Sequence, residues 1–393
     1  MRFLLPLLAA VAAGLSLLNY TRAPDTVLTW KLALVAGEFG HWLVLLPLAL
    51  GAAALFAKNP EWRITTLVLC AVAGVGFLRP AFTAWRMSRT LPARLEAAFG
   101  SKPAPVVAVF DPARLFWHPA APAAAVATEV FARSDAGPLT LDFYAPQRIP
   151  VDSRAAVSAA RPAACIVVVH GGGWDGGDSA QFVGWNHRWA ARGYAVAALN
   201  YRLAPRHPWP AQREDVLHAI AWLKANASRL GLDPHRFVLF GRSAGGQIAA
   251  AVAYGAHDPD IVGLVALHAP HDMKFAWSVS REDDALNSIK LLRQLFGGPP
   301  DTPDRAALYE SASGQLLARA DSVPTLLIHG VPDTLTWYRH SRRLDTRLQE
   351  LGVRHYLLEF PWATHAFDYN ADGPAGQLTD YAIAVFLEQV TRR

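Results

Sequence analysis

The sequence predicts an α/β domain with a mostly parallel sheet, preceded by an apolar helical segment. Three observations lead to this fold class. Short apolar runs alternate with longer amphipathic stretches after about Val126, glycines follow several of these runs, and three almost charge-free runs lie before residue 80. Charged residues make up only 18% of the 393 residues, below the roughly 25% of average soluble chains. We therefore expect part of the chain in an apolar environment.

The apolar excess is concentrated in three runs near the N-terminus. They cover residues 3–18, 42–57 and 64–78, and each is somewhat shorter than the ~20 residues of a typical membrane span. The second run extends back to Leu32 if Glu38 and His41 are tolerated near one end. Because few charges are available for a solvent-facing side, we predict a membrane domain over residues 1–99, with about three transmembrane helices and a juxtamembrane helix. A bundle of buried soluble helices and, for residues 3–18, a cleaved signal peptide are the alternatives.

Basic residues predict the orientation of this membrane domain. With three spans and an outside N-terminus, the inside residues are Arg22, Lys31, Arg79, Arg86, Arg89 and Arg94, and the outside ones are Arg2, Lys58 and Arg63. Since basic residues favour the cytoplasmic side, we expect the C-terminal domain in the cytoplasm, at a bacterial-type inner membrane. A cleaved or missed span reverses this orientation. The net charge of +5 lies largely beside apolar segments and does not indicate nucleic-acid binding.

The rest of the chain divides into a linker rich in proline and alanine over residues 100–125 and an α/β domain over 126–393. The expected strands cover residues 126–133, 139–144, 166–170, 195–199, 237–240, 261–267, 325–328 and 355–359. The helix-like stretches cover residues 178–192, 211–227, 244–254, 336–351 and 376–390. Their alternation with the strands predicts a mostly parallel eight-stranded sheet with helices on both faces. The first two strands suit an antiparallel edge. Residues 270–323 are expected to form a cap insertion, in which Trp277 and Phe296 either line a pocket or form the core of the cap.

The candidate nucleophile follows the fifth strand. That strand leads directly into Gly241-Arg242-Ser243-Ala244-Gly245, and a helix of small residues follows. This strand–turn–helix order is the context of a nucleophile elbow, in which glycines permit the tight turn and the helix N-terminus favours negative charge. Chance supplies about 0.1 such pentapeptides in a chain of this length, so the flanking elements carry much of the prediction that Ser243 is a nucleophile.

A run of glycines after the third strand is the second motif. It reads His170-Gly171-Gly172-Gly173-Trp174, and its backbone N–H groups are free to face a ligand. An oxyanion hole needs donors about 3 Å from the forming alkoxide, and we assign this role to Gly172, Gly173 and Ala244. The supporting motif residues are His170, Gly171, Gly241 and Gly245. A flexible turn is the alternative for the glycine run taken alone.

An acid and a base follow later strands. Asp333 comes soon after the seventh strand, and His365 lies between the last strand and the last helix. The chain order Ser243, Asp333, His365 is the order of this type of triad. The alternatives are a helix N-cap for Asp333 and an ordinary surface histidine for His365.

These motifs together resemble the H-G-G-G esterases of the α/β-hydrolase superfamily, including the hormone-sensitive-lipase-like group and its acetyl-esterase and feruloyl-esterase-like branch. The resemblance covers about Val126 to the C-terminus. Its further support is residues 141–146, residues 200–205, Asp215, Gly330-x-x-Asp333 and His365-Ala366-Phe367-Asp368. The sequence departs from the family at Arg242, where an acidic residue is frequent, and at Ala366, where a glycine is usual.

The motifs and the resemblance imply a carboxylic ester hydrolase that uses a Ser-His-Asp triad and an acyl-enzyme intermediate. No metal or organic cofactor is expected, since no metal-binding spacing is present. We expect a membrane-anchored esterase or lipase whose partners are the bilayer and a small-molecule or lipid ester. A membrane-lipid or prenylcysteine-type ester hydrolase, an amidase or peptidase with the same triad, and a catalytically silent membrane scaffold stay open. The sequence does not indicate the natural substrate or the oligomeric state.

Overall fold

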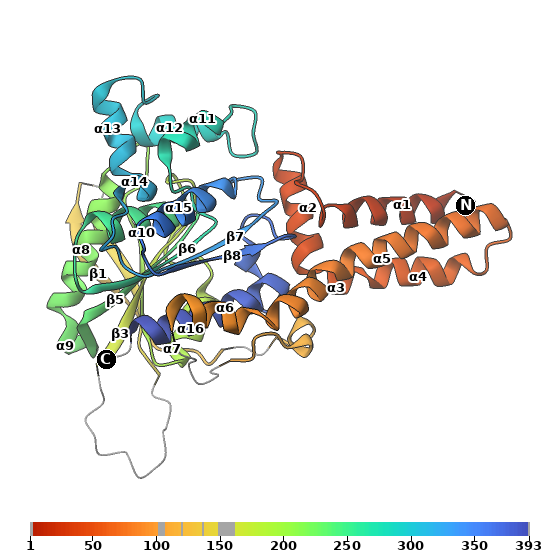
Figure 1. Ribbon diagram of the computed structural model, residues 1–393, viewed down its shortest axis with the longest axis horizontal. Coiled ribbons are helices and arrows are strands. Elements are labelled where there is room, and N and C mark those ends of the chain that lie inside the picture. Colours follow the sequence, from red (N-terminus) through yellow and green to blue (C-terminus); the bar gives the residue numbers. More distant parts are fainter. Residues whose placement is uncertain (1–2, 101–106, 119–120, 136, 148–161, 392–393) are drawn as a thin grey trace, which may run out of the picture.

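The computed structural model describes residues 3–100, 107–118, 121–135, 137–147 and 162–391. These residues form an α/β body and a helical arm that projects from one side of the body, with the N-terminus at its far end (Figure 1). Arg2 and, in the predicted linker, residues 101–106 and 119–120 lie outside the described residues.

A single sheet forms the centre of the body. Within the described residues its strands are β1 (Val126–Ser134), β2 (Gly137–Tyr144), β3 (Ala163–Val169), β4 (Ala195–Leu199), β5 (Leu232–Arg242), β6 (Ile261–Leu267), β7 (Thr325–Gly330) and β8 (His355–Phe360). The order is β1-β2-β4-β3-β5-β6-β7-β8. β2 runs antiparallel to β1 and β4, and the pairs from β4 to β8 are parallel. The predicted mostly parallel sheet with an antiparallel edge is therefore confirmed.

Helices pack on both faces of the sheet. One face is covered by α8 (Ala211–Ala225), α10 (Ala244–Gly255) and α15 (Arg339–Glu350), and the other by α6 (Leu91–Phe99), α7 (Val183–Ala191) and α16 (Pro374–Thr391). The short α9 (Ala227–Leu230) follows α8. Successive side chains of a strand point to opposite faces. Val167 therefore packs on the face covered by α8, α10 and α15, and Val168 packs on the face covered by α6, α7 and α16. This double burial explains why the strands are continuous apolar runs.

Two predicted helices begin later than the sequence suggested. α7 begins at Val183 rather than near Asp178, after Phe182 in a left-handed conformation with a φ of 56°. α15 begins at Arg339 rather than Thr336, and the N–H group of Thr336 donates to Asp333 in the loop before this helix. Both helices are therefore shorter than predicted, and the residues between Asp333 and α15 belong to a loop.

The predicted cap lies between β6 and β7. It comprises α11 (Met273–Val279), α12 (Ser288–Phe296), α13 (Pro303–Ser311) and α14 (Gly314–Leu317). Phe296 stacks on Tyr309 with ring centroids 4.0 Å apart, and Trp277 meets the same ring edge-on at 6.2 Å. Of the two roles left open for Trp277 and Phe296, the structure shows that of cap core.

The arm is built from α1 (Leu4–Leu17), α3 (Gly40–Leu43), α4 (Leu45–Ala54) and the first part of α5 (Pro60–Ser88). In Figure 1 α1, α4 and α5 lie side by side, and α2 (Val27–Glu38) lies across the base of the arm. Asn19 joins these helices at the base, because its amide donates to the carbonyl oxygens of Ala36 and Gly76.

The predicted helix boundaries in the arm need two corrections. The second apolar run does not extend back to Leu32 as one straight helix, since α2 and the helical stretch Gly40–Ala54 are bent by 80° at their break. The third run and the first half of the expected juxtamembrane helix form a single helix, because α5 continues through Pro80 to Ser88. By length and composition, α5 is able to cross a membrane, and the bent pair is a second candidate. The expectation of about three spans stays a prediction.

Glu38 and Arg114 are among the residues that tie the chain before β1 to the body. The carboxylate of Glu38, at the end of α2, accepts hydrogen bonds from the Ala375 N–H (3.1 Å) and from Nε1 of Trp362 (3.3 Å). In the expected linker, the turn η1 (Pro112–Leu115) carries Arg114, whose Nε lies 3.0 Å from an Asp372 carboxylate oxygen. The described part of the linker is therefore packed against the body.

Candidate active site

Ser243 lies at the turn between β5 and α10. Its φ of 52° and ψ of −124° are a strained conformation for a residue with a side chain. The turn requires glycines on both sides: a Cβ at Gly241 would lie 2.3 Å from the carbonyl oxygen of Gly245, and one at Gly245 would lie 2.1 Å from that of Val169. This is the geometry of the predicted nucleophile elbow.

The predicted oxyanion donors lie around the same cavities as Ser243. Gly172 and Gly173 have φ values of 121° and 59°, which favour glycine. The hydrogen bonds within the described part of the chain use none of the N–H groups of Gly172, Gly173 and Ala244. Free backbone donors beside a candidate nucleophile suit oxyanion binding, and their role stays a prediction.

His170 shapes the loop that carries these glycines. Its ring stacks on Tyr201 with centroids 4.1 Å apart, and its Nδ1 lies 2.7 Å from the carbonyl oxygen of Gly171. The Gly171 N–H donates to the side chain of Gln181 at 2.8 Å. Burial lowers the pKa of His170, so a neutral ring is favoured. His170 and Gly171 therefore contact the residues around the glycine loop, and their role as supporting motif residues stays a prediction.

Asp333 is fully buried in the loop after β7. One carboxylate oxygen accepts from the N–H groups of Leu335 (2.8 Å) and Thr336 (2.9 Å), and the other lies 2.8 Å from Nδ1 of His365 and 3.3 Å from Nε2 of His329. Burial alone would raise the pKa of Asp333, but His365 and His329 outweigh it and hold this pKa well below its usual range. Asp333 is thus a charged acceptor aimed at His365.

His365 lies in the loop after β8, beside Ala366 with its left-handed φ of 60°. Ser243 and His365 line one cavity of about 470 Å³, together with Gly172 and Gly173. β3, β5, β7 and β8 are mutually parallel, so the loops that follow them meet at the carboxyl edge of the sheet, where α/β proteins bind ligands. The structure therefore brings the three predicted triad residues to one place.

A buried ion cluster lies directly beside the triad. The Asp368 carboxylate pairs with Nε of Arg242 and lies 3.1 Å from Nε2 of His268, whose ring centroid is 4.3 Å from that of His365. Burial and the nearby His365 lower the pKa of His268 to about 4, although Asp368 opposes them. His268 is therefore neutral near pH 7. The departure from the family at Arg242 is balanced by Asp368, which sequence reasoning did not pair with it.

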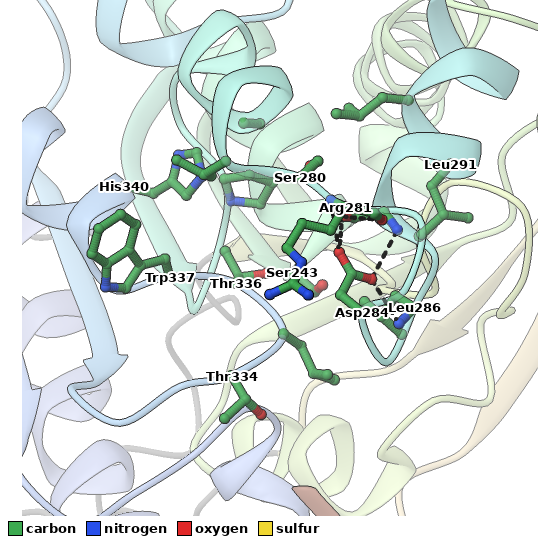
Figure 2. Close-up of a pocket in the computed structure, with 18 of the residues that line it drawn as sticks. Ser243, Ser280, Arg281, Asp284, Leu286, Leu291, Thr334, Thr336, Trp337 and His340 are labelled. Carbon is green, nitrogen blue, oxygen red and sulfur yellow. Dashed lines mark hydrogen bonds between the residues drawn. The ribbon is translucent and has the colours of Figure 1, made fainter. Parts of the chain in front are cut away.

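Two cavities meet at Ser243. We call the first, of about 340 Å³, the cap cavity, and the second, of about 470 Å³, the loop cavity. The cap cavity extends beneath α11 and α12, and Figure 2 shows Trp337 and His340 on one side of Ser243 and Leu291 on the other. Trp174 lines the cap cavity, whereas Trp277 and Phe296 line neither cavity.

Three residues of the N-terminal segment also line these cavities. Arg22 and Asp25 line the cap cavity, and Trp30 lines the loop cavity. Nε1 of Trp30 donates to the carbonyl oxygen of His365 at 3.0 Å, and Arg22 donates to that of Thr334 at 3.3 Å. Sequence reasoning missed these residues, because they lie more than 300 positions from their partners and outside the resemblance.

Metal binding receives no support from side-chain clustering. Among the residues that the structure describes, no group of three or more His, Cys, Asp or Glu side chains is placed to hold a metal ion. The expectation that no cofactor is needed stays a prediction.

Comparison with known proteins identifies the family. The profile of the family described as BD-FAE matches residues 152–348, half of the chain. The chain belongs to this family. Among curated proteins, Esterase LipC of Mycobacterium tuberculosis is 30% identical over 248 residues, which are 59% of this chain and 60% of LipC. The probable carboxylic ester hydrolase LipM of the same organism is 29% identical over 48% of its length. The chain thus spans about half to 60% of these relatives.

Solved structures support the fold. The BD-FAE member matches the thermophilic esterase Est2 of Thermogutta terrifontis with a TM-score of 0.52 and 25% identity, covering 69% of this chain and 92% of Est2. It matches esterase LipW of Mycobacterium marinum with a TM-score of 0.53 at 24% identity, covering 81% of this chain and 91% of LipW. The α/β-hydrolase fold and the predicted likeness to the hormone-sensitive-lipase-like esterases are confirmed.

Proposed function

We propose that this BD-FAE protein is a carboxylic ester hydrolase with the triad Ser243, His365 and Asp333. The observation that carries the proposal is the 2.8 Å contact between Nδ1 of His365 and Asp333, in a cavity that His365 shares with the strained Ser243. The curated relatives are esterases by name, and their likeness supports the same reaction class here.

The proposed cycle has two halves. In the first, His365 takes the proton of the Ser243 hydroxyl while the oxygen attacks the ester carbonyl, and Asp333 holds the imidazolium. The N–H groups of Gly172, Gly173 and Ala244 bind the tetrahedral oxyanion. His365 then gives its proton to the leaving alcohol, which departs and leaves an acyl-Ser243 ester. In the second half, water loses a proton to His365 and attacks this ester, and the proton returns to Ser243.

Labelling by a fluorophosphonate probe tests the triad. The full chain is expected to be labelled covalently, and Ser243→Ala is expected to lose the label and about 10⁴-fold or more of its turnover of p-nitrophenyl acetate. The matched control is Ser278→Ala, since Ser278 is exposed on α11 and bonds only to its own helix. Full labelling of Ser243→Ala would refute the assignment.

Matched ester and amide substrates distinguish an esterase from an amidase with the same triad. Esters and amides that share the same acyl group give the ratio of kcat/KM values for the two bond types, and the proposal expects the ester to be strongly preferred. A preferred amide would make the protein an amidase with the same triad.

We propose further that the arm inserts into a bilayer. Many large apolar side chains on α1, α4 and α5 are exposed, among them Leu7, Leu48 and Val75. From Arg63 at the far end of α5 to Arg79 at its base the helix rises about 24 Å, close to the ~30 Å hydrocarbon core, and long arginine side chains reach the interface beyond these positions. The basic excess at the base supports the body on the cytoplasmic side.

Carbonate extraction of membranes tests the insertion. The full chain is expected to stay in the membrane pellet at high pH, because an inserted arm is held by apolar burial rather than by charge. A triple change of Leu7, Leu48 and Val75 to Asp is expected to release it, since each charge in the hydrocarbon costs a few kcal/mol. A wild-type chain that is extracted into the supernatant would contradict the insertion.

A further inference from the structure

The N-terminal segment forms one wall of the active site. Residues 22–30 are called the lip here: Arg22 and Asp25 line the cap cavity, and Trp30 lines the loop cavity. The lip is fixed to both catalytic loops, through Arg22 to the carbonyl of Thr334, next to Asp333, and through Trp30 to the carbonyl of His365. It lies outside the segment matched by the family profile.

A loop of the cap lies beside the lip: burial and the charge of Asp284 raise the pKa of Asp25, and the backbone N–H of Ala285 opposes this rise. Asp284 organises this loop, since its carboxylate accepts hydrogen bonds from the N–H groups of Arg281, Leu286 and Ser288. Leu286 lines both cavities and is 39% exposed. Figure 2 shows Arg281, Asp284 and Leu286 together on one side of Ser243 and Thr334 on another. An exposed leucine at the meeting point of two cavities presents an apolar surface to an entering ligand.

The cap cavity combines an apolar interior with a charged rim. Its interior side chains include Val279, Leu291, Leu292 and Trp337. The charges contributed by the lip and the facing loop are Arg22, Arg281, Asp25 and Asp284, two of each sign. This balance favours no charged head group, and the whole cavity of about 340 Å³ is at the low end of ligand pockets. The site therefore suits an uncharged ester with a hydrocarbon chain of moderate length.

The lip is also close to the base of the arm. Asn19 marks that base, because it bonds to carbonyl groups of α2 and α5. Arg22 is three residues further, at most about 11 Å along the chain. If the arm is inserted, as proposed above, the entrance beside the lip lies near the lipid head groups, whose layer is roughly 5–8 Å thick on each side.

We propose that the lip is the membrane-facing entrance of the active site, and that the substrate is an uncharged ester amphiphile that enters from the bilayer. Its hydrocarbon chain passes between the lip and Leu286 and occupies the cap cavity, which places the ester carbonyl at Ser243. The proposal rests on the proposed esterase activity and arm insertion, and it adds the substrate class and the route of entry.

The test compares two esters with one enzyme preparation. The full chain is reconstituted in vesicles of phosphatidylcholine and phosphatidylglycerol, and it is given either soluble p-nitrophenyl acetate or 4-methylumbelliferyl laurate dissolved in the vesicles. Wild type is expected to hydrolyse the laurate ester with at least tenfold higher kcat/KM than the soluble ester, with both values expressed per total substrate concentration at one lipid concentration.

Leu286→Asp tests the route of entry. A charge in the path of the chain is expected to lower kcat/KM for the vesicle ester at least tenfold more than it lowers kcat/KM for p-nitrophenyl acetate, and an unchanged Tm shows that the variant is folded. Leu316→Asp is the matched control, because Leu316 is an exposed leucine on α14 that lines neither cavity. It is expected to leave both rates unchanged.

The outcomes distinguish a failure of the proposed entrance from a failure of the proposed esterase activity. Hydrolysis of the soluble ester without preference for the vesicle ester would overturn the bilayer route and leave the esterase assignment intact. Equal losses on both esters in Leu286→Asp would overturn the entrance, since Leu286 would then act only through the fold. No hydrolysis of either ester by wild type, with Ser243 unlabelled, would overturn the proposed function and this inference with it.

Discussion

The buried pair of Arg242 and Asp368 allows a quantitative test of how the site is held together. Their side chains are 2% and 0% exposed, and the two Nη atoms of Arg242 have no hydrogen-bond partner among the described residues. Removing one member leaves an uncompensated charge in a buried place, which costs about 3–5 kcal/mol. Removing both members removes the charge as well as its counterion. The double variant is therefore expected to be more stable than the sum of the single effects predicts.

The variants are Asp368→Asn, Arg242→Met and their combination. At roughly 2–4 °C per kcal/mol for a domain of this size, each single substitution is expected to lower Tm by roughly 6–20 °C. The double variant is expected to lower Tm by less than the two single effects added together. Tm is measured on the full chain in detergent micelles from the fluorescence of its 13 tryptophans.

The same pair predicts a pH dependence with a defined sign. Burial raises the pKa of Asp368, but Arg242 and His268 outweigh it and hold this pKa well below its usual range. A carboxyl group with a depressed pKa contributes stability above its unfolded value of about 3.9, and this contribution is lost as the pH falls toward the folded value. The Tm difference between wild type and Asp368→Asn is therefore expected to be constant above about pH 5 and to shrink below about pH 4. Single variants that melt within 2 °C of wild type, or additive effects in the double variant, would refute the reasoning.

Three further predictions concern the catalytic loops. Asp333→Asn is expected to lower kcat by about 10⁴-fold with little change in KM, because an amide cannot hold His365 in the acceptor tautomer; a loss below tenfold in steady-state kinetics would exclude Asp333 as the triad acid. Gly245→Ala is expected to abolish fluorophosphonate labelling and to destabilise the fold by about 1–3 kcal/mol, because its Cβ would lie 2.1 Å from a backbone oxygen; a labelled variant with wild-type Tm would contradict the tight elbow. Trp30→Phe removes the donor to the His365 carbonyl and is expected to cost about 0.5–1.5 kcal/mol, seen as a lower Tm, whereas Trp117→Phe at a 75% exposed position serves as the control and is expected to have no effect.

The positions of the predicted triad residues could be read from the sequence, because each is marked by the short segments on either side of it. Ser243, Asp333 and His365 each follow a recognisable apolar run, and the ends of parallel strands meet at one edge of the sheet. The position between the last strand and the last helix then distinguishes His365 from the other histidines. The catalytic roles of these residues stay predictions that the variants above test, whereas the sheet and its mostly parallel order are confirmed.

The contacts that were not predicted depend on tertiary packing. Trp30 and His365 are 335 positions apart, and no periodicity or motif links them. The pairing of Arg242 with Asp368 left a weak signal, because a basic residue beside a nucleophile in a buried strand requires a counterion somewhere. The late start of α15 was not predicted either: the N–H groups of Leu335 and Thr336 bind Asp333, and Asp333 contacts His365, a tertiary contact that the residue pattern does not reveal.

The contact of Glu38 with the body limits how far the protein can be treated as modular. The carboxylate of Glu38 binds the Ala375 N–H near the first turn of α16 and the indole of Trp362, three residues before His365. Deleting residues 1–88 would therefore remove an internal brace of the loop that carries His365 as well as the arm. The remaining fragment would lack part of the wall of both cavities, and its substrate profile should not be transferred to the whole chain. For protein engineering, α2 has to be kept with the body even where the helices of the arm are replaced.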